Sequence, residues 1–261
     1  MDQPDHAPDG GFALDMPRLL PRRQVLSLIG AAGASVLGSS AAAQVVCPMP
    51  AMETPGPFPG DGTNRRSGQV INVLTEGGVV REDLRPSFAG QGGTADGVPM
   101  RLTVAIVSAD GCTPLPGAAL YIWHCDAAGR YSLYDLPDRN YLRGLGIADA
   151  AGKLRFTTIV PGCYAGRWPH FHFEVFADAA AATNGRAARL TSQFALPEAP
   201  IKKTYRASRA YSRSVSNLER TSFARDVVFR DNSDGEMEAM MLTLTGAPEQ
   251  GYLCDVTVPL G

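Results

Sequence analysis

Histidine and cysteine, the usual ligands of structural zinc sites, are scarce in this chain of 261 residues. Four histidines are present, and the five cysteines show neither Cys-x-x-Cys nor zinc-finger spacing. Charged residues make up 19% of the chain, the net charge is −2, and no basic stripe is present. These shortages argue against a zinc finger, and we expect no nucleic-acid partner. Internal repeats, coiled-coil heptads and low-complexity tracts are lacking as well.

A strongly apolar run is also missing near the N-terminus. Thirteen of the nineteen residues from Val25 to Ala43 are Gly, Ser or Ala, which would make a weak membrane span. Arg22 and Arg23 precede this run, and a small-residue cleavage site ends at Ala43. The pattern predicts a cleavable twin-arginine (Tat-type) signal over residues 1–43, with an N-terminal membrane anchor as the alternative. We therefore expect passage through the Tat translocon, a periplasmic or secreted protein and no stable membrane insertion after cleavage.

What the chain does have in quantity is glycine, with 28 residues, and proline, with 20. Residues 44–100 are loop-rich, and short β-rich runs separated by Gly, Pro and Asp turns follow from residue 101 to residue 261. This alternation predicts an all-β fold, a sandwich of short, mainly antiparallel strands with long loops. The expected strands are 69–74, 102–107, 119–125, 153–160, 170–176, 190–196, 227–230, 240–244 and 252–259. Helical structure is expected at 217–220, and residues 179–188 are left open between a helical turn and a loop.

Two of the four histidines, His170 and His172, are separated by one residue in an expected strand. The two-residue period of a strand puts both imidazoles on one face, as two metal ligands would require. Tyr164 and Arg167 lie just upstream, behind a Pro-Gly turn. The alternative is that two polar residues merely alternate on a half-exposed strand. Tyr131, which follows an apolar strand and a Gly-Arg turn, adds a second tyrosine to the set.

Several separated segments resemble the intradiol ring-cleavage dioxygenases, the non-haem ferric enzymes that include catechol 1,2-dioxygenase and protocatechuate 3,4-dioxygenase. The segments match in order and spacing, over roughly residues 101–196 with an upstream extension. They are Tyr121–Ser132, Tyr141–Gly144, Thr157–Tyr164, Arg167–His172 and Thr191–Phe194, with Glu53–Phe58 upstream.

The resemblance implies four ligands of Fe(III), namely Tyr131, Tyr164, His170 and His172. Two phenolates are hard anionic donors suited to a ferric ion, and two neutral imidazoles complete the protein ligands. It further implies that Tyr164 takes a substrate proton, that Arg167 stabilises the developing negative charge, and that Gln193 orients the substrate or O2.

The implied activity is insertion of both atoms of O2 into a catechol-type ring, which is cleaved between its hydroxyl-bearing carbons to give a muconate-type diacid. The alternative is an exported β-sandwich that binds a metal or a glycan without cleaving rings. A third hypothesis is an intradiol-like fold that keeps its iron but lacks the catechol pocket.

Some residues depart from the family pattern or stand outside it. Residues 44–100 show none of the helical dimerisation segment of the intracellular catechol 1,2-dioxygenases, so the oligomeric state is left open. Cys163 replaces a Pro or Trp and could alter the pocket wall. We expect His124 to be structural rather than a ligand, and Trp123 to belong to the core. For a disulfide, which an oxidising periplasm permits, we predict the pair Cys112–Cys254.

Overall fold

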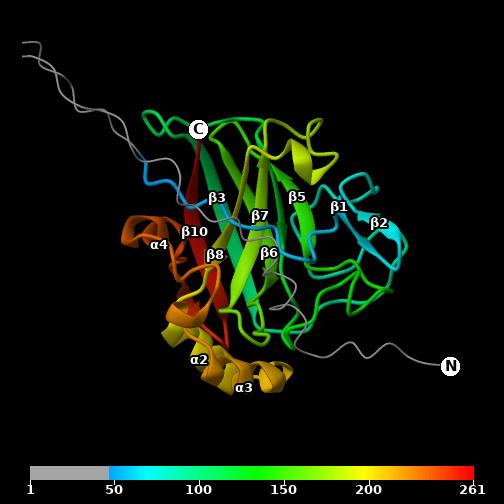
Figure 1. Cartoon of the computed structure of the whole chain (residues 1–261), viewed down its shortest axis with the longest axis vertical. Coiled ribbons are helices and arrows are strands. Elements are labelled where there is room, and N and C mark those ends of the chain that lie inside the picture. Colours follow the sequence, from blue (N-terminus) through cyan, green and yellow to red (C-terminus); the bar gives the residue numbers. More distant parts are fainter. Residues whose placement is uncertain (1–46) are drawn as a thin grey trace, which may run out of the picture.

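The computed structural model describes residues 47–261, so the expected export signal at 1–43 lies outside the described residues. Two four-stranded sheets form the body of the molecule (Figure 1). One has the strand order β6–β3–β10–β9 and the other β5–β4–β7–β8. In the first, the strands are β6 (Lys153–Ile159), β3 (Pro99–Ser108), β10 (Gly251–Leu260) and β9 (Thr245–Ala247). In the second, they are β5 (Arg143–Ile147), β4 (Ala119–Trp123), β7 (His170–Phe176) and β8 (Leu190–Ala195).

The two sheets bury a common apolar core between them. Leu102, Val104 and Ile106 alternate along β3 and belong to this core. Phe171 and Phe173 of β7 belong to the same core, as the two-residue period of a strand predicts. Within the two sheets, all pairs of neighbouring strands are antiparallel except β3 and β10, which run parallel. The expected β-sandwich is therefore confirmed.

Smaller elements surround the sandwich. A two-stranded ribbon of β1 (Asp61–Arg66) and β2 (Gln69–Asn72) lies beside β5 in Figure 1. The helices α2 (Glu198–Ala207), α3 (Ser212–Arg220) and α4 (Asp234–Met240) follow β8 in the chain. Short 3-10 turns are η2 (Gly185–Ala187), η3 (Arg209–Tyr211) and η4 (Phe223–Arg225). No helix within residues 47–261 is long and apolar enough to cross a membrane.

Two expected strands in the C-terminal region are wrong. Residues 227–230 form a turn, because the Asp226 carboxylate accepts the backbone N–H groups of Val228 and Phe229. Residues 240–244 begin at the end of α4 rather than in a sheet. That helix is started by a capping box, in which Ser233 and Glu236 each bond the other's backbone N–H.

The predicted disulfide is also wrong. Cys112 is bonded to Cys47, with their Cα atoms 5.7 Å apart, and Cys254 is a free, buried thiol. Strand register explains this, because Cys254 lies opposite Leu102 while Cys112 follows the end of β3 at Ser108. The part of β3 from Leu102 to Ser108 spans roughly 20 Å at about 3.3 Å per residue. That distance is far beyond the reach of a disulfide.

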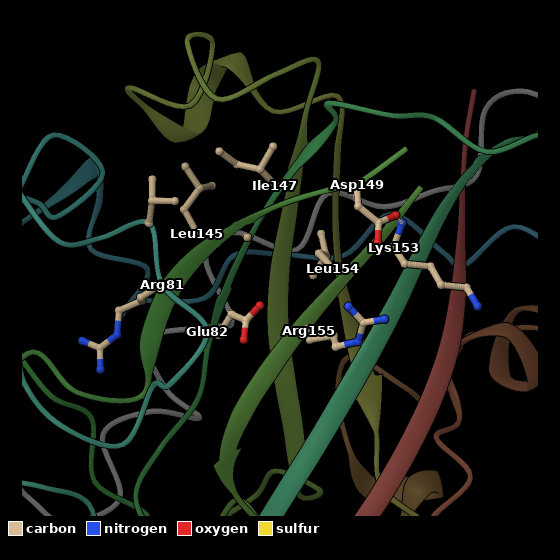
Figure 2. A pocket seen from close by; sticks show the side chains of 10 residues that line it. Arg81, Glu82, Leu145, Ile147, Asp149, Lys153, Leu154 and Arg155 are labelled. Atoms are coloured by element: carbon tan, nitrogen blue, oxygen red, sulfur yellow. Dashed lines mark hydrogen bonds between the residues drawn. The ribbon is translucent and has the colours of Figure 1, made fainter. Parts of the chain in front are cut away.

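An open groove of about 330 Å³ lies at the edge of the sandwich, between β5 and β6. Figure 2 shows Leu145 and Ile147 on one side, Lys153 and Arg155 on the other, and Glu82 between them. The histidines and tyrosines of the expected metal site are not among the residues that line it. The expected site therefore lies elsewhere in the fold.

Removing the disulfide should destabilise the protein. Its two cysteines are 65 residues apart, so a double Cys47→Ser/Cys112→Ser variant should lose about 2–4 kcal/mol of unfolding free energy. Urea unfolding of both proteins measures the difference. As a control, a reducing agent should weaken the wild type and leave the double variant unchanged. Equal sensitivity of the two proteins to the reducing agent would contradict the Cys47–Cys112 pairing.

Candidate active site

The expected histidines lie on the outer face of the β5–β4–β7–β8 sheet. Phe171 and Phe173 of β7 point into the inter-sheet core, so His170 and His172 are on the opposite face. The Trp123 ring stacks on His172 with a centroid distance of 5.0 Å, which puts it on this face rather than between the sheets. Strand pairing aligns one residue from each of the four strands in a row on this face, in the order Arg143, Trp123, His172, Gln193.

Residues 51–60, here called the strap, cover this outer face before the chain enters β1 (Figure 1). At β8, the Glu53 N–H donates to the Thr191 carbonyl at 2.8 Å, and the Thr54 carbonyl accepts the outward-facing Gln193 amide at 3.0 Å. Over β4, the Tyr121 hydroxyl donates to the carbonyl of Pro59 at 2.8 Å. The Phe58 ring lies 5.0 Å from the Tyr131 ring. The strap thus buries the outer face, which explains why every residue of β7 is buried although only one face meets the core.

The two imidazoles present ring nitrogens to each other. Nε2 of His170 lies 3.0 Å from Nε2 of His172. Nδ1 of His170 donates to the carbonyl of Trp168 at 2.5 Å, which leaves the Nε2 lone pair of His170 available to a ligand. Burial lowers the pKa of both histidines well below the ordinary value, and for His170 the Arg167 charge acts in the same direction. Both imidazoles are therefore neutral at pH 7, the form that binds a metal.

The two expected tyrosines come from loops and meet the imidazoles. The Tyr164 hydroxyl lies 3.3 Å from Nε2 of His170. The Tyr131 ring lies 5.7 Å from the Tyr164 ring and 6.3 Å from the His172 ring. The hydroxyl of Tyr131 is buried and has no hydrogen-bond partner. Burial raises the pKa of this phenol well above its usual value, so its ionisation requires a nearby positive charge.

This arrangement fits a metal ion held by tyrosines and histidines. Four donor groups from β7 and two loops converge, and a buried phenol without a partner is costly unless something binds it. Within residues 47–261, no group of three or more His, Cys, Asp and Glu side chains is arranged to hold a metal. A metal at this place would therefore need the phenol oxygens, which are hard donors suited to a trivalent ion.

Arg167 and Gln193 are fully buried beside the donors. Nη2 of Arg167 donates to Oε1 of Gln193 at 2.6 Å, and Nη1 lies 3.5 Å from the Tyr164 hydroxyl. The Gln193 amide nitrogen donates to the carbonyl of Thr54 in the strap at 3.0 Å. The structure therefore brings all six predicted site residues together, including the arginine and the glutamine.

Sequence reasoning missed the residues that hold this cluster. Asp226 forms a buried ion pair with Arg167, and their closest atoms are 3.1 Å apart. Arg143 donates to the Ser132 carbonyl next to Tyr131 at 3.0 Å and to the Pro59 carbonyl of the strap at 2.7 Å. Arg143 lies in the Tyr141–Gly144 segment that resembles the family, and a basic residue in an apolar strand is a signal that sequence analysis could use. Asp226 has no such signal in the sequence.

Helix α3 ties the two tyrosine-bearing loops together. The Ser214 hydroxyl donates to the carbonyl of Ala127, upstream of Tyr131, at 2.7 Å. It also accepts the N–H of Cys163, next to Tyr164, at 2.8 Å. The loops touch so closely that a Cβ on Gly162 would lie 2.4 Å from the Asp126 carbonyl oxygen. Any larger residue there would push against the backbone of Asp126 and Ala127 in the other loop.

His124 takes no part in this cluster. Its Nδ1 bonds the carbonyl of Cys125 at 2.8 Å, and its Nε2 bonds the Thr158 hydroxyl at 2.7 Å. Its ring packs edge-on against Phe171, and burial lowers its pKa to about 3. The residue is therefore a neutral, structural histidine, as expected.

Comparison with known proteins relates this arrangement to a family. A family model described as Dioxygenase matches residues 81–194, the range that contains all six predicted site residues. The protocatechuate 3,4-dioxygenase beta chain of Burkholderia cepacia is 38% identical over 82 residues, which are 26% of this chain and 35% of the relative. Parts of the chain are therefore similar in sequence to intradiol ring-cleavage dioxygenases. Catechol 1,2-dioxygenase of Pseudomonas sp. (strain EST1001) is 42% identical over 52 residues, or 20% of this chain and 17% of that protein.

These matches span about a third or less of the length of the two curated relatives. The fold similarity extends further. An intradiol ring-cleavage dioxygenase from Tetranychus urticae superposes with a TM-score of 0.58 over 82% of this chain and 95% of that structure, at 18% identity. The sequence similarity is thus local, whereas the superposition shows that the fold is shared over most of the chain.

Replacing Gly162 by alanine should disturb the site through backbone crowding. The added Cβ would overlap the carbonyl oxygens of Asp126 and Ala127, so we expect a loss of about 1–3 kcal/mol in stability. It should also weaken metal uptake, because the Tyr131 and Tyr164 loops must separate. Thermal unfolding and metal content per chain measure both effects. Gly235→Ala is the matched control, because Gly235 lies in α4 with open space around it. This variant should keep both its stability and its metal content. Normal stability and metal content in Gly162→Ala would show that the loops tolerate the separation.

Proposed function

We propose that the protein is a non-haem Fe(III) intradiol dioxygenase that cleaves a catechol-type ring between its two hydroxyl-bearing carbons. The observation that carries this proposal is the convergence of two buried phenols and two neutral imidazoles beside a buried arginine. The local matches to intradiol dioxygenases support the same reaction class. The product would be a muconate-type diacid that contains both oxygen atoms of O2.

Tyr131, Tyr164, His170 and His172 would hold the iron. When bound, ferric iron would supply the positive charge that ionises phenols and catechol hydroxyls and the redox character that makes the ring reactive toward O2. The His170–Trp168 hydrogen bond fixes the ring orientation and the tautomer of His170. Tyr131, which has no other hydrogen-bond partner, would contribute a phenolate oxygen.

Tyr164 is suited to receive a proton from the substrate. Its exposed fraction is 8%, against 1% for Tyr131 and 2% for each histidine, so it is the donor most open to an incoming molecule. Its hydroxyl lies within reach of Nη1 of Arg167. With iron bound and Tyr164 ionised, a substrate hydroxyl that approaches from this side could pass its proton to the Tyr164 oxygen, and the neighbouring guanidinium would stabilise the negative charge left on the substrate.

Arg167 and Gln193 would act on the ring itself. A buried guanidinium remains charged, and in a site shielded from water it stabilises negative charge that develops on a bound catechol. Gln193 is held between Arg167 and the strap, so its amide has a fixed direction for orienting substrate or O2. The strap helps to exclude bulk water from this face of the sheet.

The setting of the reaction is proposed from the sequence. The twin arginine at Arg22 and Arg23 supports export through the Tat translocon to the periplasm or beyond. A disulfide between Cys47 and Cys112 fits an oxidising compartment. A small catechol-type aromatic and O2 would be the partners in the reaction.

The decisive experiment measures O2 uptake by purified, iron-loaded protein with catechol, 4-methylcatechol, protocatechuate and hydroxyquinol. We expect uptake with at least one substrate and a diacid product that carries label from ¹⁸O2 at both carboxyl groups. The concentrated protein should show a broad visible band from phenolate–Fe(III) charge transfer. A yellow semialdehyde product would mean extradiol cleavage and would refute the proposal. Colourless protein with stoichiometric zinc or copper would instead favour an exported metal-binding protein.

Phenylalanine at either tyrosine should remove one phenolate ligand. We expect Tyr131→Phe and Tyr164→Phe each to change the visible band and to lower kcat/KM by at least about 100-fold. Absorption spectra and iron content per chain separate a lost ligand from a lost fold. Tyr252→Phe is the control, because Tyr252 is a buried tyrosine whose hydroxyl bonds Thr204 and Pro200, away from the site. An unchanged band in either site variant would refute the ligand role of that tyrosine.

A further inference from the structure

The carboxylate of Asp226, in the C-terminal segment, contacts the site. This residue follows η4, lies outside the 81–194 match to the dioxygenase family, and is fully buried. Its two oxygens accept hydrogen bonds from one side chain and three backbone groups. The donors are Nε of Arg167 at 3.2 and 3.1 Å and the N–H groups of Trp168 at 2.6 Å, Val228 at 2.8 Å and Phe229 at 3.2 Å.

The geometry of the guanidinium makes this contact directional. A guanidinium is planar, so fixing its Nε edge also fixes where its Nη atoms point. With Nε held by Asp226, Nη2 meets Gln193 at 2.6 Å and Nη1 lies 3.5 Å from the Tyr164 hydroxyl. The carboxylate also balances a positive charge that would otherwise be buried alone, which is unfavourable. Asp226 therefore sets both the direction and the electrostatic environment of Arg167.

The Asp226 carboxylate is also linked to His170, through the backbone of Trp168. It accepts the N–H of Trp168, and the carbonyl of Trp168 accepts Nδ1–H of His170. The backbone on each side of Trp168 is thus fixed, by Asp226 on one side and by His170 on the other. Movement of Asp226 would shift the arginine and the histidine together.

Building on the proposed function, we propose that Asp226 is the positioning residue of the site. It holds Arg167 with its Nη edge toward Tyr164 and Gln193, and it fixes the Trp168 backbone that orients His170. Asp226 does not touch the substrate, and it acts on the reaction through Arg167.

The test compares wild type, Asp226→Asn, Arg167→Gln and the double variant. Asparagine keeps the shape of the side chain and an oxygen acceptor for the turn but loses the charge. We expect Asp226→Asn to keep its iron, to shift the visible band, and to lower kcat at least 10-fold with KM changed less than about 3-fold. If Asp226 acts through Arg167, adding Asp226→Asn to Arg167→Gln should lower kcat by less than 2-fold further. Asp226→Glu, which keeps the charge, should recover part of the loss.

A second measurement does not depend on iron or activity. In metal-free protein, nitrogen-15 NMR should show the Arg167 Nε–H as a slowly exchanging resonance, assigned by its absence in Arg167→Gln. That resonance should broaden or exchange rapidly in Asp226→Asn. It should persist in Asp149→Asn, the control, because Asp149 also caps a turn by accepting two backbone N–H groups but is remote and exposed.

The outcomes are distinguishable. Unchanged kcat and an unchanged Arg167 resonance in Asp226→Asn would overturn the positioning role, even if the protein cleaves catechols. Independent, multiplying losses in the double variant would also overturn it, because the Trp168–His170 contact, and not Arg167, would then carry the effect of Asp226 on the reaction. If the wild type cleaves no catechol, the proposed function fails, yet the NMR comparison still decides whether Asp226 positions Arg167. Should Asp226→Asn fail to fold, Asp226→Ser, which also removes the charge, serves instead, and a wild-type kcat and Arg167 resonance in it would overturn the proposal.

Discussion

The structure depends on one constraint, the burial of four polar donor groups on a single face of a sheet. Neutral imidazoles and protonated phenols are costly to bury without partners, and Tyr131 has none. The surrounding structure must therefore hold these groups in place despite the free-energy cost of burying them. Three supports do so, namely the strap across the face, helix α3 behind the two tyrosine loops, and Asp226 beneath Arg167.

The supports come from different parts of the chain than the donors. All four donor residues lie within the range that matches the dioxygenase family, whereas the strap, Ser214 and Asp226 lie outside it. The segment that carries the donor residues is thus the one that matches the family model. The segments that hold it in place lie on either side of it in the sequence.

The sequence predicted that these side chains would meet, because the geometry of three of them is local. The two-residue period of β7 is enough to bring His170 and His172 together, and the Pro-Gly turn placed Tyr164 nearby. Asp226 was beyond prediction because its partner is 59 residues away and its neighbours Val228 and Phe229 read as a strand. The predicted Cys112–Cys254 disulfide was wrong for a related reason, since the parallel register of β3 and β10 keeps these two cysteines apart and no local pattern encodes that register.

The same long-range contacts join the two ends of the domain through the site. The Thr54 carbonyl of the strap accepts the Gln193 amide, Gln193 accepts Nη2 of Arg167, and Arg167 is held by Asp226. Each link is buried or partly buried and directional, so a displacement at one end changes the hydrogen bonds at the next. A strap that moved to admit a molecule would release Gln193 first and loosen Arg167 second. Covering the site and aligning its charged group are therefore linked by one hydrogen-bonded chain.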